Sequence, residues 1–261
     1  MRRFSAWQHA LSLFTVIPAG TGGELDERDA ARAVLWMPAV GLLLGLAGAG
    51  VITGVAAAGG ADSGPRRLLG AALAVALLAL LTGGLHLDGL ADTADGLGSR
   101  RPPSAALDIM RRSDVGPMGV ATLVLVLLIQ VTALAAVPRA PAAGLALALA
   151  AVTSRVAVVL ATGSAAARPG GFGALVAGQT TARGRAASVI LLGCAVAAAG
   201  AGLGGAGLAW RGLAAAAAGL LAGSVMRLIA VRRLGGMTGD VFGAIVEIST
   251  AAVLVTCALV N

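Results

Sequence analysis

The sequence predicts an all-α protein, a polytopic transmembrane helical bundle of about seven spans with an amphipathic helix near its N-terminus. Three observations predict it. The 261 residues are 58% apolar and 12% charged, with a mean hydropathy of +0.92, whereas soluble domains are about 25% charged. Several apolar runs approach the roughly 20 residues that cross a bilayer. The 39 glycines suit close contact between helices in lipid.

The elements follow in order along the chain. Residues 1–18 hold an apolar stretch interrupted by Gln8 and His9, which favours a retained amphipathic helix over a cleaved signal peptide. Seven further segments approach the length of a membrane span, with a range of five to eight allowed. Their expected limits are 34–57, 67–86, 117–137, 142–162, 187–206, 212–231 and 241–260. The fifth is rich in Gly and Ala and is expected to be bent or only partly inserted. We expect a single integral membrane domain over residues 1–261, with the lipid bilayer around it. The sequence also allows an oligomer.

The basic residues set the expected orientation. All 19 are arginines, and the net charge is +7. Membrane proteins concentrate basic residues in cytoplasmic loops, so we interpret this charge as topological and expect no nucleic acid as a partner. With seven crossings, fourteen arginines fall on the side of the N-terminus and four on the other side. The N-terminus is therefore expected in the cytoplasm and the C-terminus outside.

Acidic residues gather at the end of the second expected span. Asp88, Asp92 and Asp95 stand at positions i, i+4 and i+7, which lie on one face of a helix. Three like charges there repel one another, and either bound cations or arginines would relieve this. Oxygen ligands favour a hard ion, Mg²⁺ or else Mn²⁺, so the three are candidate metal ligands; the alternative is an acidic surface helix in water. Gly89 and Gly96 are expected to leave room for a ligand beside the backbone.

Other polar side chains near the membrane complete the candidate site. Arg111 follows the acidic segment and offers forked donors to phosphate, although it is also suited to anchoring the loop at the membrane surface. Asp240 and Glu247 are seven residues apart on one helical face. An intramembrane Glu247 needs a partner, for which Arg155 in the fourth span and the metal cluster are candidates. For His86 the sequence leaves open a capping or orienting role and a role in proton transfer.

This set favours transfer of a phosphorus-linked group, because divalent ions bridge diphosphates and a carboxylate accepts the proton of an attacking hydroxyl. The chain has no lysine and therefore no P-loop, and it lacks the Gly-x-Ser-x-Gly and His-Glu-x-x-His signatures of common hydrolases. A transporter coupled to cations or protons is the competing class. Placement of the acids at one end of a span, away from the midplane, counts against it.

Two strings carry a resemblance to a known family. They read Gly83-Gly-Leu-His-Leu-Asp-Gly-Leu-Ala-Asp-Thr-Ala-Asp-Gly96 and Leu234-Gly-Gly-Met-Thr-Gly-Asp-Val-Phe-Gly-Ala-Ile-Val-Glu247. The sequence here closely resembles the cobalamin synthases, the adenosylcobinamide-GDP ribazoletransferases. The likeness continues through residues 14–18, 109–119 and 154–155, and so covers nearly the whole chain.

The resemblance implies a multi-pass enzyme of the bacterial inner membrane, with its active site facing the cytoplasm, in the last steps of cobalamin biosynthesis. Such enzymes join adenosylcobinamide-GDP to α-ribazole, or to its 5′-phosphate, release GMP and require Mg²⁺. Carried over by motif, the metal would be held against the diphosphate by Asp88, Asp92 and Asp95. Catalysis would fall to His86, Asp88, Asp92 and Asp240, and phosphate contact or support to Arg111, Arg155 and Glu247.

One departure from the family pattern concerns the loop before the third span. Where relatives often read Met-Arg-Asp-Ser-Arg, this chain reads Met110-Arg-Arg-Ser-Asp114. Either Arg112 and Asp114 form a compensated salt bridge, or the loop contacts phosphate differently. The scheme also resembles the CDP-alcohol phosphotransferases, whose aspartates bind divalent ions at a membrane face. Their spacing differs from the spacing here, and they remain the runner-up.

Overall fold

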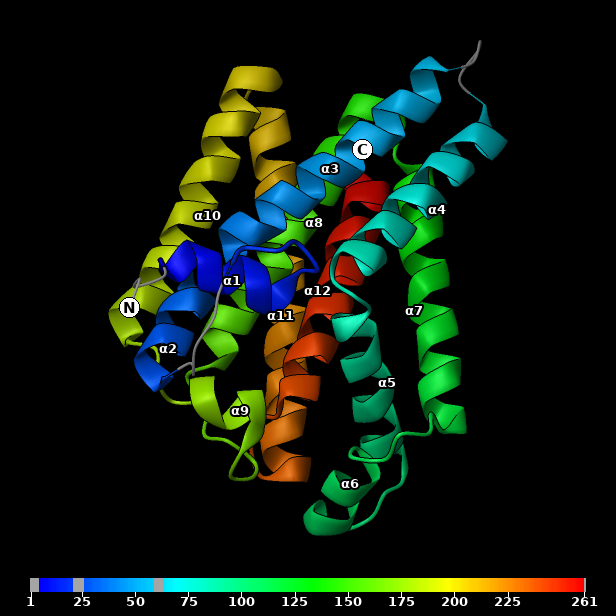
Figure 1. Cartoon of the computed structure of the whole chain (residues 1–261). Coiled ribbons are helices and arrows are strands. Elements are labelled where there is room, and N and C mark those ends of the chain that lie inside the picture. The colour runs from blue at the N-terminus through cyan, green and yellow to red at the C-terminus, as the bar shows by residue number, and fades with distance from the viewer. Residues whose placement is uncertain (1–4, 21–25, 59–62, 261) are drawn as a thin grey trace.

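The computed structural model describes residues 5–20, 26–58 and 63–260. In this part of the chain the regular structure is helical, apart from one isolated bridge, and seven helices are long and apolar enough to cross a membrane (Figure 1). The predicted all-α bundle is confirmed. The spanning helices are α3 (Met37–Ala57), α4 (Gly64–Leu81), α7 (Pro117–Ala136), α8 (Ala140–Ala161), α10 (Ala182–Leu203), α11 (Ala206–Leu234) and α12 (Gly239–Val260). The shorter helices are α1 (Ala6–Phe14), α2 (Glu27–Leu35), α5 (Leu85–Gly98), α6 (Pro103–Ile109) and α9 (Gly171–Val176).

The predicted end of the second span differs from the structure. The second span was expected to reach residue 86, but α4 ends at Leu81. Gly83 and Gly84 follow with φ angles of 60° and 72°, a region that glycine adopts without strain. A new helix, α5, starts at Leu85, so His86 belongs to the acidic helix and not to the span. The fifth predicted span is one continuous helix of 22 residues, α10, and is long and apolar enough to cross a membrane.

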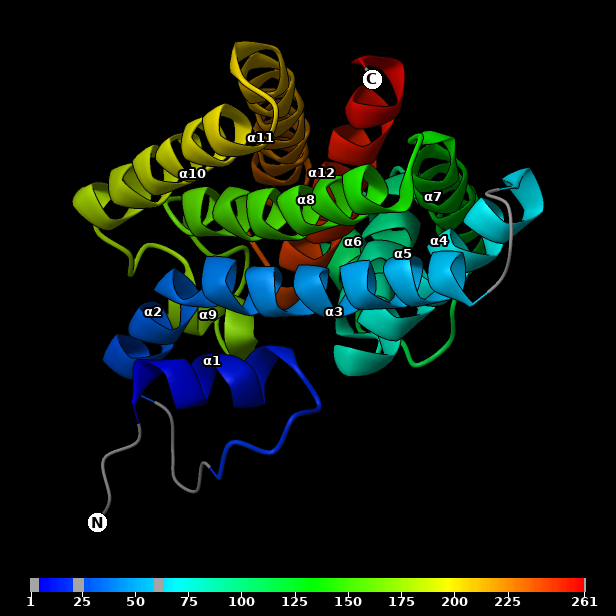
Figure 2. The ribbon, with the colours of Figure 1, turned by 90° about the horizontal axis from the view of Figure 1, so that it is seen from above.

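Helix α8 forms the centre of the bundle. It has the largest buried share of the seven spanning helices, and Figure 2 shows it between α3 on one side and α10 and α11 on the other. Its small side chains permit this, since small residues let helices approach closely. A Cβ atom added at Gly45 of α3 would lie 2.6 Å from the Cα of Ala148. The glycine of α3 is therefore needed for the two helices to touch.

A second close approach joins α5 to α12. A Cβ atom at Gly89 would lie 2.6 Å from the backbone oxygen of Asp240, and one at Gly243 would lie 3.0 Å from that of His86. The expectation that Gly89 and Gly96 leave space for a ligand is thus wrong. The backbone of α12 occupies the space beside Gly89, and the side chain of Met110 occupies the space beside Gly96.

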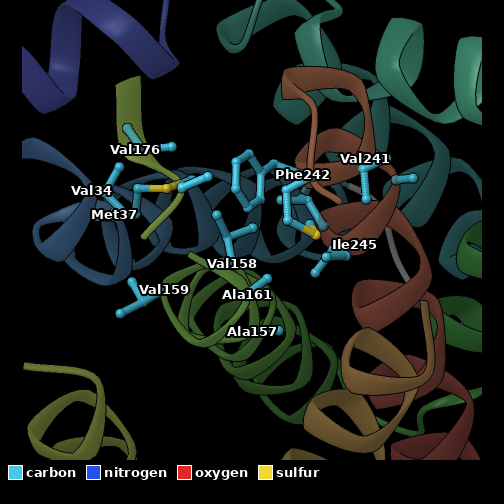
Figure 3. Packing of buried hydrophobic residues seen from close by; sticks show 14 of the residues in the cluster. Val34, Met37, Ala157, Val158, Val159, Ala161, Val176, Val241, Phe242 and Ile245 are labelled. Atoms are coloured by element: carbon cyan, nitrogen blue, oxygen red, sulfur yellow. The ribbon is translucent and has the colours of Figure 1, made fainter. Parts of the chain in front are cut away.

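The end of the bundle that carries α5, α6 and the beginning of α12, here called the carboxylate end, is covered by short helices. Helices α1, α2 and α9 pack there against α3, α8 and α12 (Figures 1 and 2). Met37, Val158 and Phe242 come from three of these spans and lie in one buried cluster (Figure 3). The rings of Phe14 and Phe172 meet edge to face, with centroids 5.5 Å apart. The expected N-terminal helix therefore forms part of the wall at this end.

We expect Gly89→Ala to lower stability, because the added methyl group meets the backbone of α12 and the two helices must separate. Overpacking of this kind costs about 1–3 kcal/mol. Thermal unfolding in detergent, followed by tryptophan fluorescence, measures the change. Gly54→Ala on α3 is the matched control, because a Cβ atom there meets nothing within 4 Å. Equal unfolding temperatures for the two variants would contradict the proposed contact.

Candidate active site

A cavity of about 390 Å³ lies at the carboxylate end, among α1, α5, the segment leading into α9 and the beginning of α12. Its charged lining residues are Asp88, Arg168 and Asp240. Its apolar lining includes Met37 and Phe242, which belong to the cluster shown in Figure 3. We call it the arginine cavity. Its volume lies within the roughly 300–1,000 Å³ typical of ligand sites, and it combines apolar walls with a few convergent charges, as such sites do.

Arg168 reaches this cavity because its loop is tied to the start of α12. Ala166 and Met237 form a short parallel bridge. The Arg168 Nη1 donates a hydrogen bond of 3.1 Å to the Leu107 backbone oxygen, and its Nη2 lies 3.7 Å from the Asp240 Oδ2. Arg168 was not predicted as a site residue, because in the sequence it served only as one of the arginines that set the expected membrane orientation. Its position directly before Pro169 and two glycines could have indicated a role, because this composition is typical of loops and functional residues often lie on loops.

Asp240 stands in the first turn of α12. The Thr238 hydroxyl donates to the Asp240 Oδ2 at 3.2 Å and accepts from the backbone N–H of Val241 at 3.2 Å. Thr238 therefore acts as the N-cap of the helix. The positive end of the α12 dipole faces the cavity, which favours anionic groups there.

The three aspartates of the predicted triad all lie on α5, as expected. Asp88 is exposed and lines the arginine cavity, and Asp92 lies half-buried one turn further along. Burial raises the pKa of Asp92 to about 6, and the charges of Asp88, Asp240 and Asp95 add to this effect, while Arg168 opposes it. Four carboxylates thus lie in one region, and among the described residues Arg168 is the one arginine whose charge lowers the pKa of Asp92.

Asp95 has a different set of contacts from the other two. Its Oδ2 accepts a hydrogen bond of 2.6 Å from the Gly116 N–H, and its Oδ1 accepts one of 2.9 Å from the Gly119 N–H. Both oxygens are thereby engaged at the N-terminus of α7, where backbone N–H groups lack partners within the helix. A Cβ atom at either glycine would come within 2.5 Å of this carboxylate. The structure therefore places Asp95 as the clamp between α5 and α7.

The carboxylates of this site suit a hard cation, but they supply only part of its coordination shell. Among the described residues, no three His, Cys, Asp or Glu side chains are close enough to hold a metal ion by themselves. Asp88, Asp92 and Asp240 nevertheless supply only oxygen and bring excess negative charge together. Mg²⁺ is usually bound by one or two carboxylates together with substrate phosphates. These residues therefore fit a divalent ion that is shared with a bound diphosphate.

Behind α5, a polar cluster extends into the membrane-spanning part. His86, Gln130, Arg155 and Glu247 line one small space of about 30 Å³. The Gln130 Nε2 donates to the Glu247 Oε2 at 2.7 Å and to the Glu247 backbone oxygen at 3.2 Å. The predicted partner of Glu247, Arg155, faces the same space, and the direct hydrogen bond comes from Gln130. The sequence analysis missed Gln130, although a glutamine inside an apolar span is the signal by which such residues are found.

His86 connects this cluster to the cavity. Its Nδ1 lies 3.4 Å from the Arg155 Nη2, and burial, followed by the charge of Arg155, lowers the pKa of His86 well below its ordinary value. The imidazole is therefore neutral, and its Nδ1 accepts from the guanidinium. Its Nε2 then carries the proton and, within the described chain, has no hydrogen-bond partner.

Arg111 and the reversed charges after it lie away from the cavity. Arg111 is exposed in the turn that follows α6 and does not line the arginine cavity. Arg112 and Asp114 are exposed as well, and among the described side chains no ion pair joins them. The alternative of a compensated salt bridge at these two positions is therefore wrong.

Comparison with known proteins agrees with the geometry and with the motif. The family model for cobalamin-5-phosphate synthase matches residues 6–258. The chain belongs to this family. It is 42% identical over 260 residues to the adenosylcobinamide-GDP ribazoletransferase of Frankia casuarinae, covering 96% of this chain and 93% of that protein. It is 38% identical over 255 residues to the protein of the same name from a Nocardioides species, covering 97% and 98% of the two chains. No solved structure matches the chain significantly. The resemblance noted in the sequence is confirmed, and membership places the chain among transferases.

We expect Asp92→Asn to stabilise the metal-free protein at pH 8. The pKa of Asp92 is raised from 3.8 to about 6 in the folded state, so its ionisation progressively costs stability as pH rises from about 4 to about 6. Above that range the gain on substitution should be about 1 kcal/mol after allowance for solvent screening. Below about pH 4 Asp92 of the parent is protonated in both the folded and the unfolded state, so its ionisation no longer costs stability and the difference disappears.

Thermal unfolding with a chelator present, measured across this pH range, tests the expectation. Asp108→Asn is the control, because Asp108 is exposed on α6 and surface substitutions change stability little. A variant at Asp92 that is less stable than the parent at pH 8 would show that Asp92 has a stabilising partner.

Proposed function

We propose that this protein is an adenosylcobinamide-GDP ribazoletransferase. It joins adenosylcobinamide-GDP to α-ribazole, or to its 5′-phosphate, and releases GMP. Family membership and the names of the relatives support this reaction. The observation that carries it is geometric: Asp88 of α5 and Asp240 of α12 line one cavity with Arg168, at the end of a membrane-spanning bundle. Carboxylates and a guanidinium around one space suit a diphosphate and an attacking hydroxyl.

The reaction assigns one task to each charged group. A ribose hydroxyl of the acceptor attacks the phosphorus next to the cobinamide arm, a new P–O bond forms, and the P–O bond to GMP breaks. Asp88 is exposed and, among the described residues, its carboxylate has no hydrogen bond or ion pair, so it is free to accept the proton of the hydroxyl. Arg168 and the N-terminus of α12 hold the phosphate oxygens and favour the charge that develops on leaving GMP.

We further propose that Mg²⁺, or Mn²⁺ in its place, would be held by Asp92 and Asp240 together with the diphosphate, which leaves Asp88 free to act as the base. When bound, such an ion neutralises charge on the phosphate oxygens. Asp95 serves a different purpose in this proposal, because its oxygens are taken by the amides of α7. It fixes α5 relative to α7 and thereby orients the carboxylate face.

The remaining predicted residues support the site. Arg155, paired with neutral His86, and Glu247, bonded to Gln130, join α5, α7, α8 and α12 behind the cavity. We propose that His86 orients α5 and offers its Nε2 proton as a hydrogen-bond donor. We propose that Arg168, which lines the cavity, contacts the phosphate in place of Arg111, which does not line it.

We expect purified protein in detergent to release GMP from adenosylcobinamide-GDP when α-ribazole and Mg²⁺ are present. Asp88→Asn should lower the rate by about 10²–10⁴-fold, the usual range for loss of an acid–base group, with unchanged elution in size-exclusion chromatography. Asp108→Asn should retain the rate. Chelation should stop turnover, and added Mg²⁺ should restore it. A detergent micelle has no two compartments, so a transporter would release no GMP in this assay. Absence of GMP release by the unmodified protein would therefore contradict the proposed enzymatic activity.

The topology is tested by reporter fusions at Gly98 and Gly236. We propose that the carboxylate end faces the cytoplasm of a bacterial inner membrane, since most arginines are expected on that side. Both positions adjoin helices that end there (Figure 1), so both fusions should score cytoplasmic, and a fusion at Gly204 should score external. Opposite scores for Gly98 and Gly236 would place α5 and the beginning of α12 on different sides of the membrane and would contradict the proposed site.

A further inference from the structure

A second cavity meets the arginine cavity at Asp88. Its volume is about 600 Å³, and we call it the α7 cavity. It lies among the end of α1 with the residues that follow, the Thr82–Gly84 turn, α5 and the first half of α7. The two cavities share Leu13, Leu85 and Asp88 as lining residues. Helix α5 lies between α12 and α7 (Figure 1), so one cavity opens on each side of this helix.

The two cavities differ in chemistry. The arginine cavity carries Arg168, Asp240 and the N-terminus of α12. Among the described residues that line the α7 cavity, Asp88 is the one charged side chain, and the walls are apolar groups such as Val115 and Leu123. A diphosphate needs cations and N–H donors, whereas an uncharged aromatic base gains by covering apolar surface.

We propose that the two substrates bind on opposite sides of Asp88. The diphosphate and guanosine of the donor lie in the arginine cavity, and the benzimidazole base of the α-ribazole acceptor lies in the α7 cavity. This division rests on the proposed function. It places the acceptor hydroxyl and the donor phosphorus together at Asp88, the one charged side chain that lines both spaces.

Reaction geometry supports this division. In phosphoryl transfer the attacking and leaving oxygens lie roughly in line through phosphorus, so the acceptor must approach from the side opposite to GMP. Reacting atoms must also come within about 3–3.5 Å of each other. Two cavities that lie on either side of α5 and share one carboxylate satisfy both conditions.

The test fills each cavity from its rim. Val115 is 48% exposed and Val16 is 60% exposed, and both line the α7 cavity. Val115→Trp and Val16→Trp, introduced separately, therefore fill that space from different elements without burying a new side chain in the core. Val120→Trp is the matched control, because Val120 is 50% exposed on the same helix but does not line the cavity. Ala174→Trp fills the arginine cavity.

We expect Val115→Trp and Val16→Trp to raise the KM for α-ribazole at least about tenfold, the effect of a misfitted pocket, and to leave the KM for adenosylcobinamide-GDP unchanged. Ala174→Trp should do the reverse and also weaken inhibition by GMP. Val120→Trp should match the parent. The 5′-phosphate of α-ribazole should respond like α-ribazole, because the base makes the contact. Unfolding temperature and elution volume identify any variant that misfolds.

The outcomes separate the two claims. If the parent protein releases no GMP, the proposed function fails. If the parent is active and both substitutions in the α7 cavity leave the KM for α-ribazole unchanged, or raise both KM values equally, the division of substrates is overturned. Binding of GMP, followed by thermal shift, gives a readout apart from turnover: it should persist in Val115→Trp and be lost in Ala174→Trp.

Discussion

The contact between the backbones of α5 and α12 is the constraint on which the site depends. Gly89 lies against Asp240, and Gly243 lies against the backbone of His86, so the two helices cross without side chains between them. This crossing brings the carboxylates of Asp88 and Asp92 to that of Asp240. The repulsion that results is the physical reason for the raised pKa of Asp92 beyond burial. A protein that holds such charges together without substrate is prepared to bind a cation and a diphosphate.

The two faces of α5 divide its work. On one side Asp88 faces cavities that open at the carboxylate end, and on the other His86 meets Arg155 in the interior of the bundle. Hydrogen bonds join His86 to Arg155 and Gln130 to Glu247 in this interior group, as polar groups in a membrane require, and the His86 Nε2 is the one fully buried polar atom of the group left without a partner among the described residues. A charged helix is thereby anchored to the spans by polar contacts as well as by packing. This arrangement gives the short α5 a fixed position even though it does not itself cross the bilayer.

The bundle could be predicted from the sequence because hydropathy and span length are local properties. The placement of Asp88, Asp92 and Asp95 on one helix could likewise be predicted from their spacing. Two features depended on distant partners and could not be predicted. Arg168 reaches Asp240 through a bridge between segments far apart in the chain. The oxygens of Asp95 are used by amides that lie more than twenty residues away. The early end of α4 was available in principle, since the paired glycines after Thr82 are a helix stop signal.

The hydrogen bonds of Asp95 have a consequence for the stretch between α5 and α7 that carries Arg112 and Asp114. Because the carboxylate accepts hydrogen bonds from Gly116 and Gly119, the residues between Asp95 and Gly116 form a loop whose two ends are held together. Each bond to an ionised group contributes about 1.5–3 kcal/mol, and these bonds are independent of Arg112 and Asp114. A change of charge at Arg112 or Asp114 therefore leaves the contact between α5 and α7, and with it the carboxylate face, in place.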